Sequence, residues 1–247
     1  MQKVFLIFTT FIFCLAVNGQ TVAYFKIHKT ILKDSMQMKR PSDFQKKDSV
    51  FFEDKDFLVR KTCSGEFGGS IWFKDKKTGV EYSCAATCPV VINKLDGKYI
   101  VTSTIAHLIG FSQIIEIDNP KDLDIFKLPK PRQKKGKLII RAIGDDESKS
   151  IKGTKVLVDT TGILTIASFP YNGQLYHIIT DFHKTFIAKI ENKKFVTIDT
   201  VSTQTLWTYD PEVIRTIDNH YLVFFDNDKA KGYLDLFEND IDLVRYK

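Results

Sequence analysis

Short runs rich in Val, Ile, Phe, Tyr and Thr fill this chain, and turn pairs such as Asp96-Gly97 and Asn172-Gly173 separate them. No stretch after Gln20 keeps apolar residues at helical spacing for three turns. Apolar runs bounded by glycine-containing turns are typical of β-hairpins. The pattern therefore predicts an all-β fold for the part of the chain that follows residue 20.

The turn-and-strand segments recur along the chain, with anchors near residues 57, 97, 136, 173 and 219. The gaps are 40, 39, 37 and 46 residues, and a period near 40 with about four short strands per unit is the spacing of a propeller blade. In repeat length and hairpin pattern the chain resembles the β-propeller group, which implies a five-bladed propeller. In the third unit, the first strand is expected at residues 137–140 and the second strand at residues 155–158. A β-sandwich or barrel is the alternative.

The first residues carry one lysine, an apolar run from Val4 to Val17, and then Gly19. A basic start, a short apolar core and a small residue are typical of a secretory signal peptide. The run is shorter than the roughly 20 residues that span a bilayer, although a retained anchor is the alternative. We expect residues 1–19 to be cleaved and residues 20–247 to form a single all-β domain, secreted or periplasmic.

Three cysteines, Cys63, Cys84 and Cys88, follow the predicted cleavage point. Exported proteins keep their disulfides, so we expect Cys63 to pair with Cys84 or Cys88 and one thiol to be left over. The alternative is a zinc site built from the three thiolates and His107, since zinc accepts such a ligand set. The loose spacing of the cysteines favours the disulfide, and we expect no metal and no cofactor.

The loops within the repeated units carry acids and histidines. If each unit is a hairpin that begins at its anchor, these loops all emerge on one face of the array. The candidate binding residues on that face are Glu66, His107, Asp181, His183 and Asp226. Such a face would suit a cation or a basic or polyhydroxyl ligand, and its histidines would titrate near pH ~6.5. The alternative is that loop tips are polar because turns favour Asp and Asn for backbone reasons.

The charge balance is mildly basic, with 36 Lys and Arg against 30 Asp and Glu. This excess is too small to indicate a nucleic-acid-binding protein. The segment from Lys127 to Arg141 contains no acid, and its two prolines predict an extended, solvated loop. A contact with an anionic surface, such as lipid headgroups or acidic glycans, is the functional alternative for this segment.

Signatures of catalysis are missing from the sequence: it contains no His-Glu-x-x-His, no Gly-x-Ser-x-Gly and no phosphate-binding glycine loop. We therefore name no catalytic residue. The sequence favours a secreted, non-catalytic binding or interaction module whose partner is an extracellular or periplasmic protein or glycan, with no nucleic acid and no stable membrane span. The alternative is a glycan-directed hydrolase or lyase, which would need two carboxylates about 5 to 9 Å apart in a central funnel.

Overall fold

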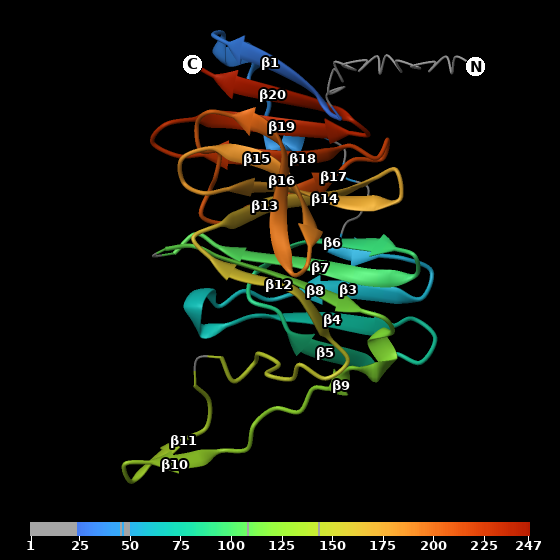
Figure 1. Ribbon diagram of the computed structural model, residues 1–247. Coiled ribbons are helices and arrows are strands. Elements are labelled where there is room, and N and C mark those ends of the chain that lie inside the picture. Colours follow the sequence, from blue (N-terminus) through green and yellow to red (C-terminus); the bar gives the residue numbers. More distant parts are fainter. Residues whose placement is uncertain (1–23, 45, 47–49, 108, 143) are drawn as a thin grey trace, which may run out of the picture.

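The computed structural model describes residues 24–44, 46, 50–107, 109–142 and 144–247, and strands dominate it, as predicted (Figure 1). The helices of these described residues are four single 3-10 turns: η1 (Ser35–Gln37), η2 (Pro41–Asp43), η3 (Gly65–Phe67) and η4 (Pro120–Asp122). In these described ranges no helix is long and apolar enough to cross a membrane. The expected signal peptide lies outside the described residues.

The described residues form four larger sheets, each with at least four antiparallel strands, and most strands of a sheet are consecutive in the chain. The first sheet contains β2 (Phe52–Glu53), β3 (Phe57–Lys61), β4 (Ser70–Asp75), β5 (Glu81–Ala85) and β9 (Asp124–Ile125). The second contains β6 (Pro89–Leu95), β7 (Lys98–Ile105), β8 (Phe111–Ile117) and β12 (Lys155–Thr161). The third contains β13 (Leu164–Tyr171), β14 (Gln174–Thr180), β15 (Thr185–Glu191) and β16 (Lys194–Ser202). The fourth contains β17 (Val213–Arg215), β18 (Tyr221–Asp226), β19 (Lys231–Phe237), β20 (Asp240–Tyr246) and β1 (Lys26–Leu32), which runs parallel to β20.

The unit expected around residue 136 is not a sheet of the stack. Its place is taken by a separate two-stranded hairpin, β10 (Arg132–Lys134) and β11 (Lys137–Ile139), and β12 pairs with β8 instead of with this segment. The segment is basic and has too few apolar residues to bury two faces, so it extends from the body (Figure 1). The other four anchors each fall in a sheet of their own. Five blades are therefore not confirmed, and no described sheet closes on itself.

Successive sheets pack against each other through three hydrophobic clusters. Strand β7 contributes to two of them, because alternate residues of a strand face opposite sides of the sheet. Tyr99 and Val101 pack with Phe73 between the first and second sheets, whereas Ile100 packs with Ile114 between the second and third. The cluster between the third and fourth sheets has an aromatic group formed by Phe25, Phe169 and Tyr176. The second and third sheets are thus covered on both faces.

A hydrogen-bond network, mostly buried, joins the second, third and fourth sheets. Asn93 of β6 donates through Nδ2 to the Ser168 carbonyl of β13 at 3.0 Å, and the Tyr221 hydroxyl of β18 donates to Asn93 Oδ1 at 3.0 Å. Ser168 Oγ lies 2.7 Å from Nδ1 of His177, whose burial lowers its pKa to about 3. His177 is therefore a neutral part of the core, and the network fixes β6 and β13 side by side.

Candidate functional site

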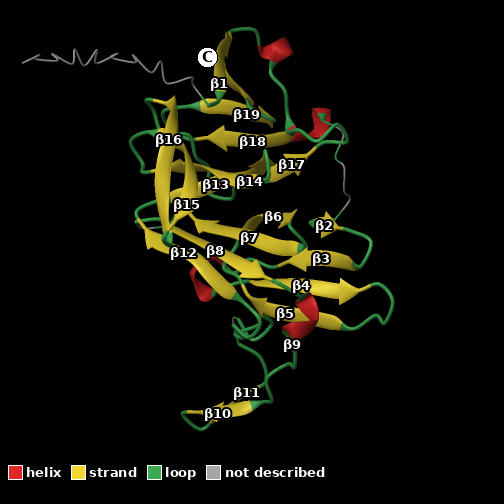
Figure 2. Ribbon diagram, turned by 45° about the vertical axis from the view of Figure 1, so that its right-hand side comes forward, coloured by secondary structure: helices red, strands yellow, loops and turns green. Residues whose placement is uncertain are grey.

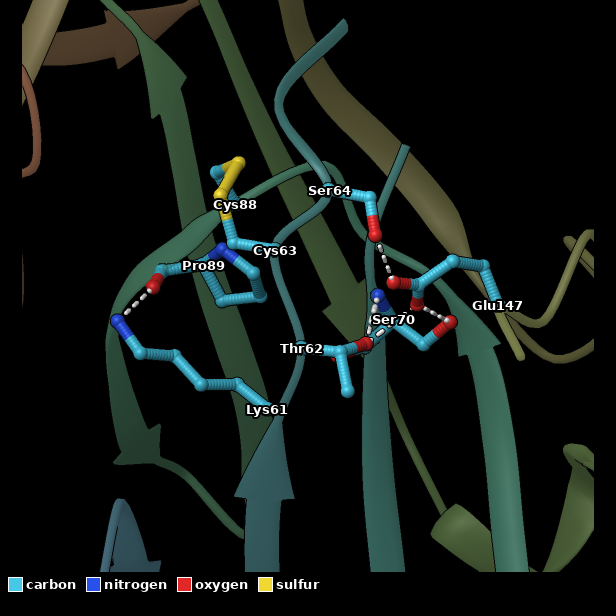
Figure 3. Close-up of a disulfide and its surroundings, with 8 residues drawn as sticks. All are labelled: Lys61, Thr62, Cys63, Ser64, Ser70, Cys88, Pro89 and Glu147. Carbon is cyan, nitrogen blue, oxygen red and sulfur yellow. Dashed lines mark hydrogen bonds between the residues drawn. A yellow bond between two sulfur atoms is a disulfide. The ribbon is translucent and has the colours of Figure 1, made fainter. Parts of the chain in front are cut away.

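The disulfide forms as predicted, between Cys63 and Cys88 (Figure 3). It links the loop after β3 to the crossing from β5 to β6, so it ties the first sheet to the second. Cys84 is the remaining thiol; it faces the cluster between these two sheets and is fully buried. This burial raises the pKa of Cys84 to about 12, so the thiol is protonated and belongs to the core rather than to a site.

The end of β3 presents side chains in two directions next to the disulfide. Lys61 points toward β6, where its ammonium donates to the Pro89 carbonyl at 2.6 Å, and Thr62 points the other way, toward Glu147 (Figure 3). The Lys61 ammonium also lies 4.9 Å from the centre of the Phe51 ring. Strand alternation places Lys61 on the same face of the first sheet as Val59, which packs between the first and second sheets, and the bridge at Cys63 holds the end of this strand.

The fourth sheet meets the first without a shared hydrophobic cluster: none of the three clusters formed by the described residues spans this junction. The contacts are polar instead. The Arg215 guanidinium lies 4.8 Å from the centre of the Phe52 ring, and Lys46 forms an isolated backbone bridge to Thr216. A hollow lies at this junction, where no hydrophobic cluster of the described residues fills the space between the two sheets.

We call this space the junction hollow; its volume is about 460 Å³. Its lining includes Phe51, Lys61, Val90, Asp210, Glu212 and Arg215. Glu212 forms an ion pair with Lys46, whose Nζ lies 2.9 Å from Glu212 Oε1. Desolvation by the walls lowers the pKa of Lys61, while the carboxylates of Glu212 and Asp210 act in the opposite direction. The hollow therefore combines an apolar wall with charges of both signs.

On the opposite side of β3 from Lys61, Glu147 binds the end of the first sheet. Its carboxylate accepts hydrogen bonds from the hydroxyls of Thr62, of Ser64 at 2.6 Å and of Ser70 at 2.8 Å. Burial acts to raise the pKa of Glu147, but the hydroxyl donors outweigh it and the pKa lies below its usual value. This buried carboxylate pins the segment after β11 to the β3–β4 loop, which is a structural role.

The structure brings two of the predicted face residues together: His107 Nδ1 lies 3.2 Å from Glu66 Oε2, so the β3–β4 and β7–β8 loops are neighbours. The β14–β15 loop follows, because the Phe182 ring lies directly against Gly110. The Phe182 ring is 6.2 Å from the Trp207 ring, and the Trp207 carbonyl accepts a hydrogen bond from Asn227 of the β18–β19 loop at 3.1 Å. The loops that carry the predicted residues thus form one continuous series.

The remaining predicted residues bond within their own loops. Asp181 accepts from the amides of His183 and Lys184 at 2.9 and 2.7 Å, and Asp226 pairs with Lys231 at 2.7 Å. The bonds of Asp181 are the turn-forming interactions that make Asp common at loop tips, whereas Asp226 and Lys231 are paired across β18 and β19. In the part of the chain that the structure describes, no group of three His, Cys, Asp or Glu side chains could hold a metal ion.

The residues of the junction hollow escaped prediction because they come from distant parts of the chain. Phe51 precedes β2, Lys61 ends β3, and Glu212 and Arg215 lie more than 140 residues later. No local spacing joins such residues. The available signal was the position of Lys61 two residues before Cys63, at a strand end that a disulfide would fix.

Comparisons of the chain with known protein families, with characterised proteins and with solved structures found no match. The description of the junction hollow rests on the geometry of this chain. Lys61 lies beside the disulfide, at the junction of the first and fourth sheets, which none of the apolar clusters of the described residues spans.

Proposed function

We propose that this chain is an exported, non-catalytic binding module that holds a carboxylate-bearing segment of a partner in the junction hollow. The observation that carries the proposal is Lys61, whose ammonium is partly desolvated next to the Phe51 ring. A desolvated ammonium gains most from a carboxylate, because their attraction is less screened there than in water. Phe51 and Val90 provide an apolar wall for the rest of the ligand.

The composition of the lining favours binding over catalysis. The described lining residues include no hydroxyl, thiol or imidazole side chain. Covalent catalysis commonly relies on one of these groups, activated by a neighbouring base. A ligand held here would instead contact the first and fourth sheets at once and so stabilise their junction.

A glycan-directed hydrolase or lyase is the second candidate, because Asp210 and Glu212 both line the same hollow. Two carboxylates in one cleft are the minimum for glycoside hydrolysis. Glu212 is already paired with Lys46, which weakens this candidate. Release of reducing ends from a panel of polysaccharides, abolished by Asp210→Asn and by Glu212→Gln, would establish the hydrolase; uncatalysed rates with the wild type would exclude it for those substrates.

We infer further that the four sheets are units of a propeller-like repeat, with four units instead of the five expected from the sequence. The support is their common strand order and the convergence of β6 and β13 through Asn93 and Ser168. Export is proposed on two grounds: the amino-terminal sequence pattern and the Cys63–Cys88 disulfide, which is characteristic of oxidising compartments.

Thermal unfolding in the presence of carboxylate probes tests the binding function. A hexaglutamate peptide and an oligogalacturonate serve as probes, with hexaglutamine and a neutral oligogalactan as their uncharged counterparts. A probe at a hundred times its Kd adds about 2.7 kcal/mol, which corresponds to a rise in Tm of about 5–11 °C for a chain of this size. We expect at least one acidic probe to raise the Tm while its neutral counterpart does not.

The variant Lys61→Gln should lose this response, because it removes the ammonium while keeping a side chain of similar length. The matched control is Lys29→Gln, an exposed lysine on β1, at the far edge of the fourth sheet. A Tm rise that survives in Lys61→Gln, or an absence of any rise with both acidic probes, would overturn the proposal.

A further inference from the structure

The segment from Lys127 to Arg141, which we call the basic arm, stands apart from the stacked sheets. It contains the β10–β11 hairpin, and both views show this hairpin beyond the first sheet, at the end of the molecule away from the carboxyl terminus (Figures 1 and 2). No residue of the arm belongs to any of the three hydrophobic clusters. The arm is therefore free of the packing that holds the rest of the fold.

The charge of the arm is concentrated and mostly uncompensated. It holds seven cations and no acid. Arg132 pairs with Asp145 and Arg141 pairs with Asp146, and both acids lie in the chain shortly after the arm ends. Among the residues that the structure describes, no carboxylate lies within ion-pair distance of the other five cations, which are Lys127, Lys130, Lys134, Lys135 and Lys137.

Three of these lysines lie at the tip of the hairpin, where their mutual repulsion and the turn conformation disfavour the hairpin. Lys134 and Lys137 are direct cross-strand partners, and like charges in such a pair repel each other. Lys135 occupies a left-handed conformation, with φ of 51°, at a turn position where Asn or Gly is preferred. An anionic surface would relieve this repulsion, so the tip has the charge pattern of a binding element.

The arm also carries exposed apolar side chains. Leu138 and Ile140 are 63% and 70% exposed, and Leu128 is also exposed. Leu138 pairs across the hairpin with Gln133, so it faces the opposite side from the Lys134 and Lys137 pair. A polyanionic glycan would engage the lysines alone. The interface of a lipid bilayer accommodates both kinds of side chain, with ammonium groups at the phosphates and apolar side chains at the boundary with the acyl chains.

We propose that the basic arm binds the surface of membranes that contain anionic phospholipid, with the three tip lysines at the headgroups and Leu138 and Ile140 at the acyl-chain boundary. This inference is independent of the junction hollow, because the arm shares no residue with it. The bound chain would be attached at one end of the sheet stack while the loops and the hollow stay accessible.

Sedimentation with lipid vesicles tests the proposal. We expect the full chain to bind vesicles of phosphatidylcholine mixed with phosphatidylglycerol, and to bind vesicles of phosphatidylcholine alone far more weakly. Each lysine near an anionic surface changes partitioning by about fivefold, so the variant Lys134→Gln/Lys135→Gln/Lys137→Gln should lose about a hundredfold. Binding should also weaken with added salt, because screening shortens the range of the attraction.

The control variant, Lys29→Gln/Lys193→Gln/Lys194→Gln, removes the same charge from β1 and from the β15–β16 turn. It should bind like the wild type, and both triple variants should keep the wild-type Tm. Equal losses in the two triple variants would mean that net charge alone acts, and this would overturn the proposal. Equal binding of the wild type to both kinds of vesicle would do the same.

A third variant separates lipid from acidic glycan. Leu138→Ser/Ile140→Ser should lower binding to the mixed vesicles by at least about tenfold, because burial of such side chains is favourable, and it should leave retention on a heparin column unchanged. If the wild type binds heparin but not the mixed vesicles, the partner is an acidic glycan and the membrane proposal is wrong.

Discussion

Removal of the Cys63–Cys88 bridge provides a quantitative test of how this fold is stabilised. The two cysteines are 25 residues apart, and a crosslink of that span restricts the unfolded chain. The loop-entropy relation for 25 residues gives about 12 cal/mol/K, or about 3.5 kcal/mol at 25 °C. For a chain of this size that loss corresponds to a fall in Tm of about 7–14 °C. We expect the variant Cys63→Ala/Cys88→Ala to show this loss in urea and thermal unfolding.

The control uses the same bridge without a mutation. Wild type unfolded in the presence of a reductant should lose about the same stability, and the double variant should not respond to the reductant. Cys84→Ala should keep the full response, because Cys84 takes no part in the bridge. A double variant within about 1 kcal/mol of wild type, together with a wild type insensitive to a reductant that opens the bridge, would refute the loop-entropy argument.

Three further predictions concern residues around this bridge. Glu147→Gln should lower the free energy of unfolding by about 1.5–3 kcal/mol at pH 7. Because the pKa of Glu147 is lower in the folded protein, the ionised carboxylate stabilises the fold above the unfolded pKa of about 4.3, and this contribution is lost as the pH falls through the folded pKa. Urea unfolding of the wild type and the variant should therefore give converging stabilities in acid. Cys84 should resist iodoacetamide in the folded protein and react on unfolding, as followed by mass spectrometry; reaction at a similar rate in both states would contradict its burial. Gly69→Ala should destabilise the fold by about 1–3 kcal/mol in urea unfolding, since the added Cβ would lie 2.7 Å from the carbonyl oxygens of Thr62 and Ala86; an unchanged midpoint would show that this crossing relaxes freely.

The strands and turns were predictable because their signals are local. Asp96-Gly97 and Asn172-Gly173 do form hairpin turns, between β6 and β7 and between β13 and β14. The same turn pattern at Gly136 led to a wrong prediction of a full repeat unit, because a hairpin does form there but joins none of the four larger sheets. A turn motif specifies the hairpin; whether the hairpin joins a core depends on the apolar faces around it.

The pairing of the cysteines was half determined by the sequence. Export and loop positions indicated a bridge from Cys63, and they left Cys84 and Cys88 as equal partners. The tertiary structure decides between them, because Cys84 lies on β5 opposite Ile71 and points into the core, whereas Cys88 lies in the crossing that follows β5. Strand alternation sets this difference, and the alternation has a direction only once the core is known.

The sequence by itself determined the all-β class, the turns and the concentration of positive charge between residues 127 and 141, because all three depend on neighbours along the chain. The tertiary structure decided the number of sheets, the pairing of β12 with β8 and the position of the junction hollow. These features depend on contacts between distant strands, and such contacts form where they bury the most apolar surface for the whole chain. Lys61 and Glu212 line the same hollow although they lie far apart in the sequence, so no local pattern contains this site.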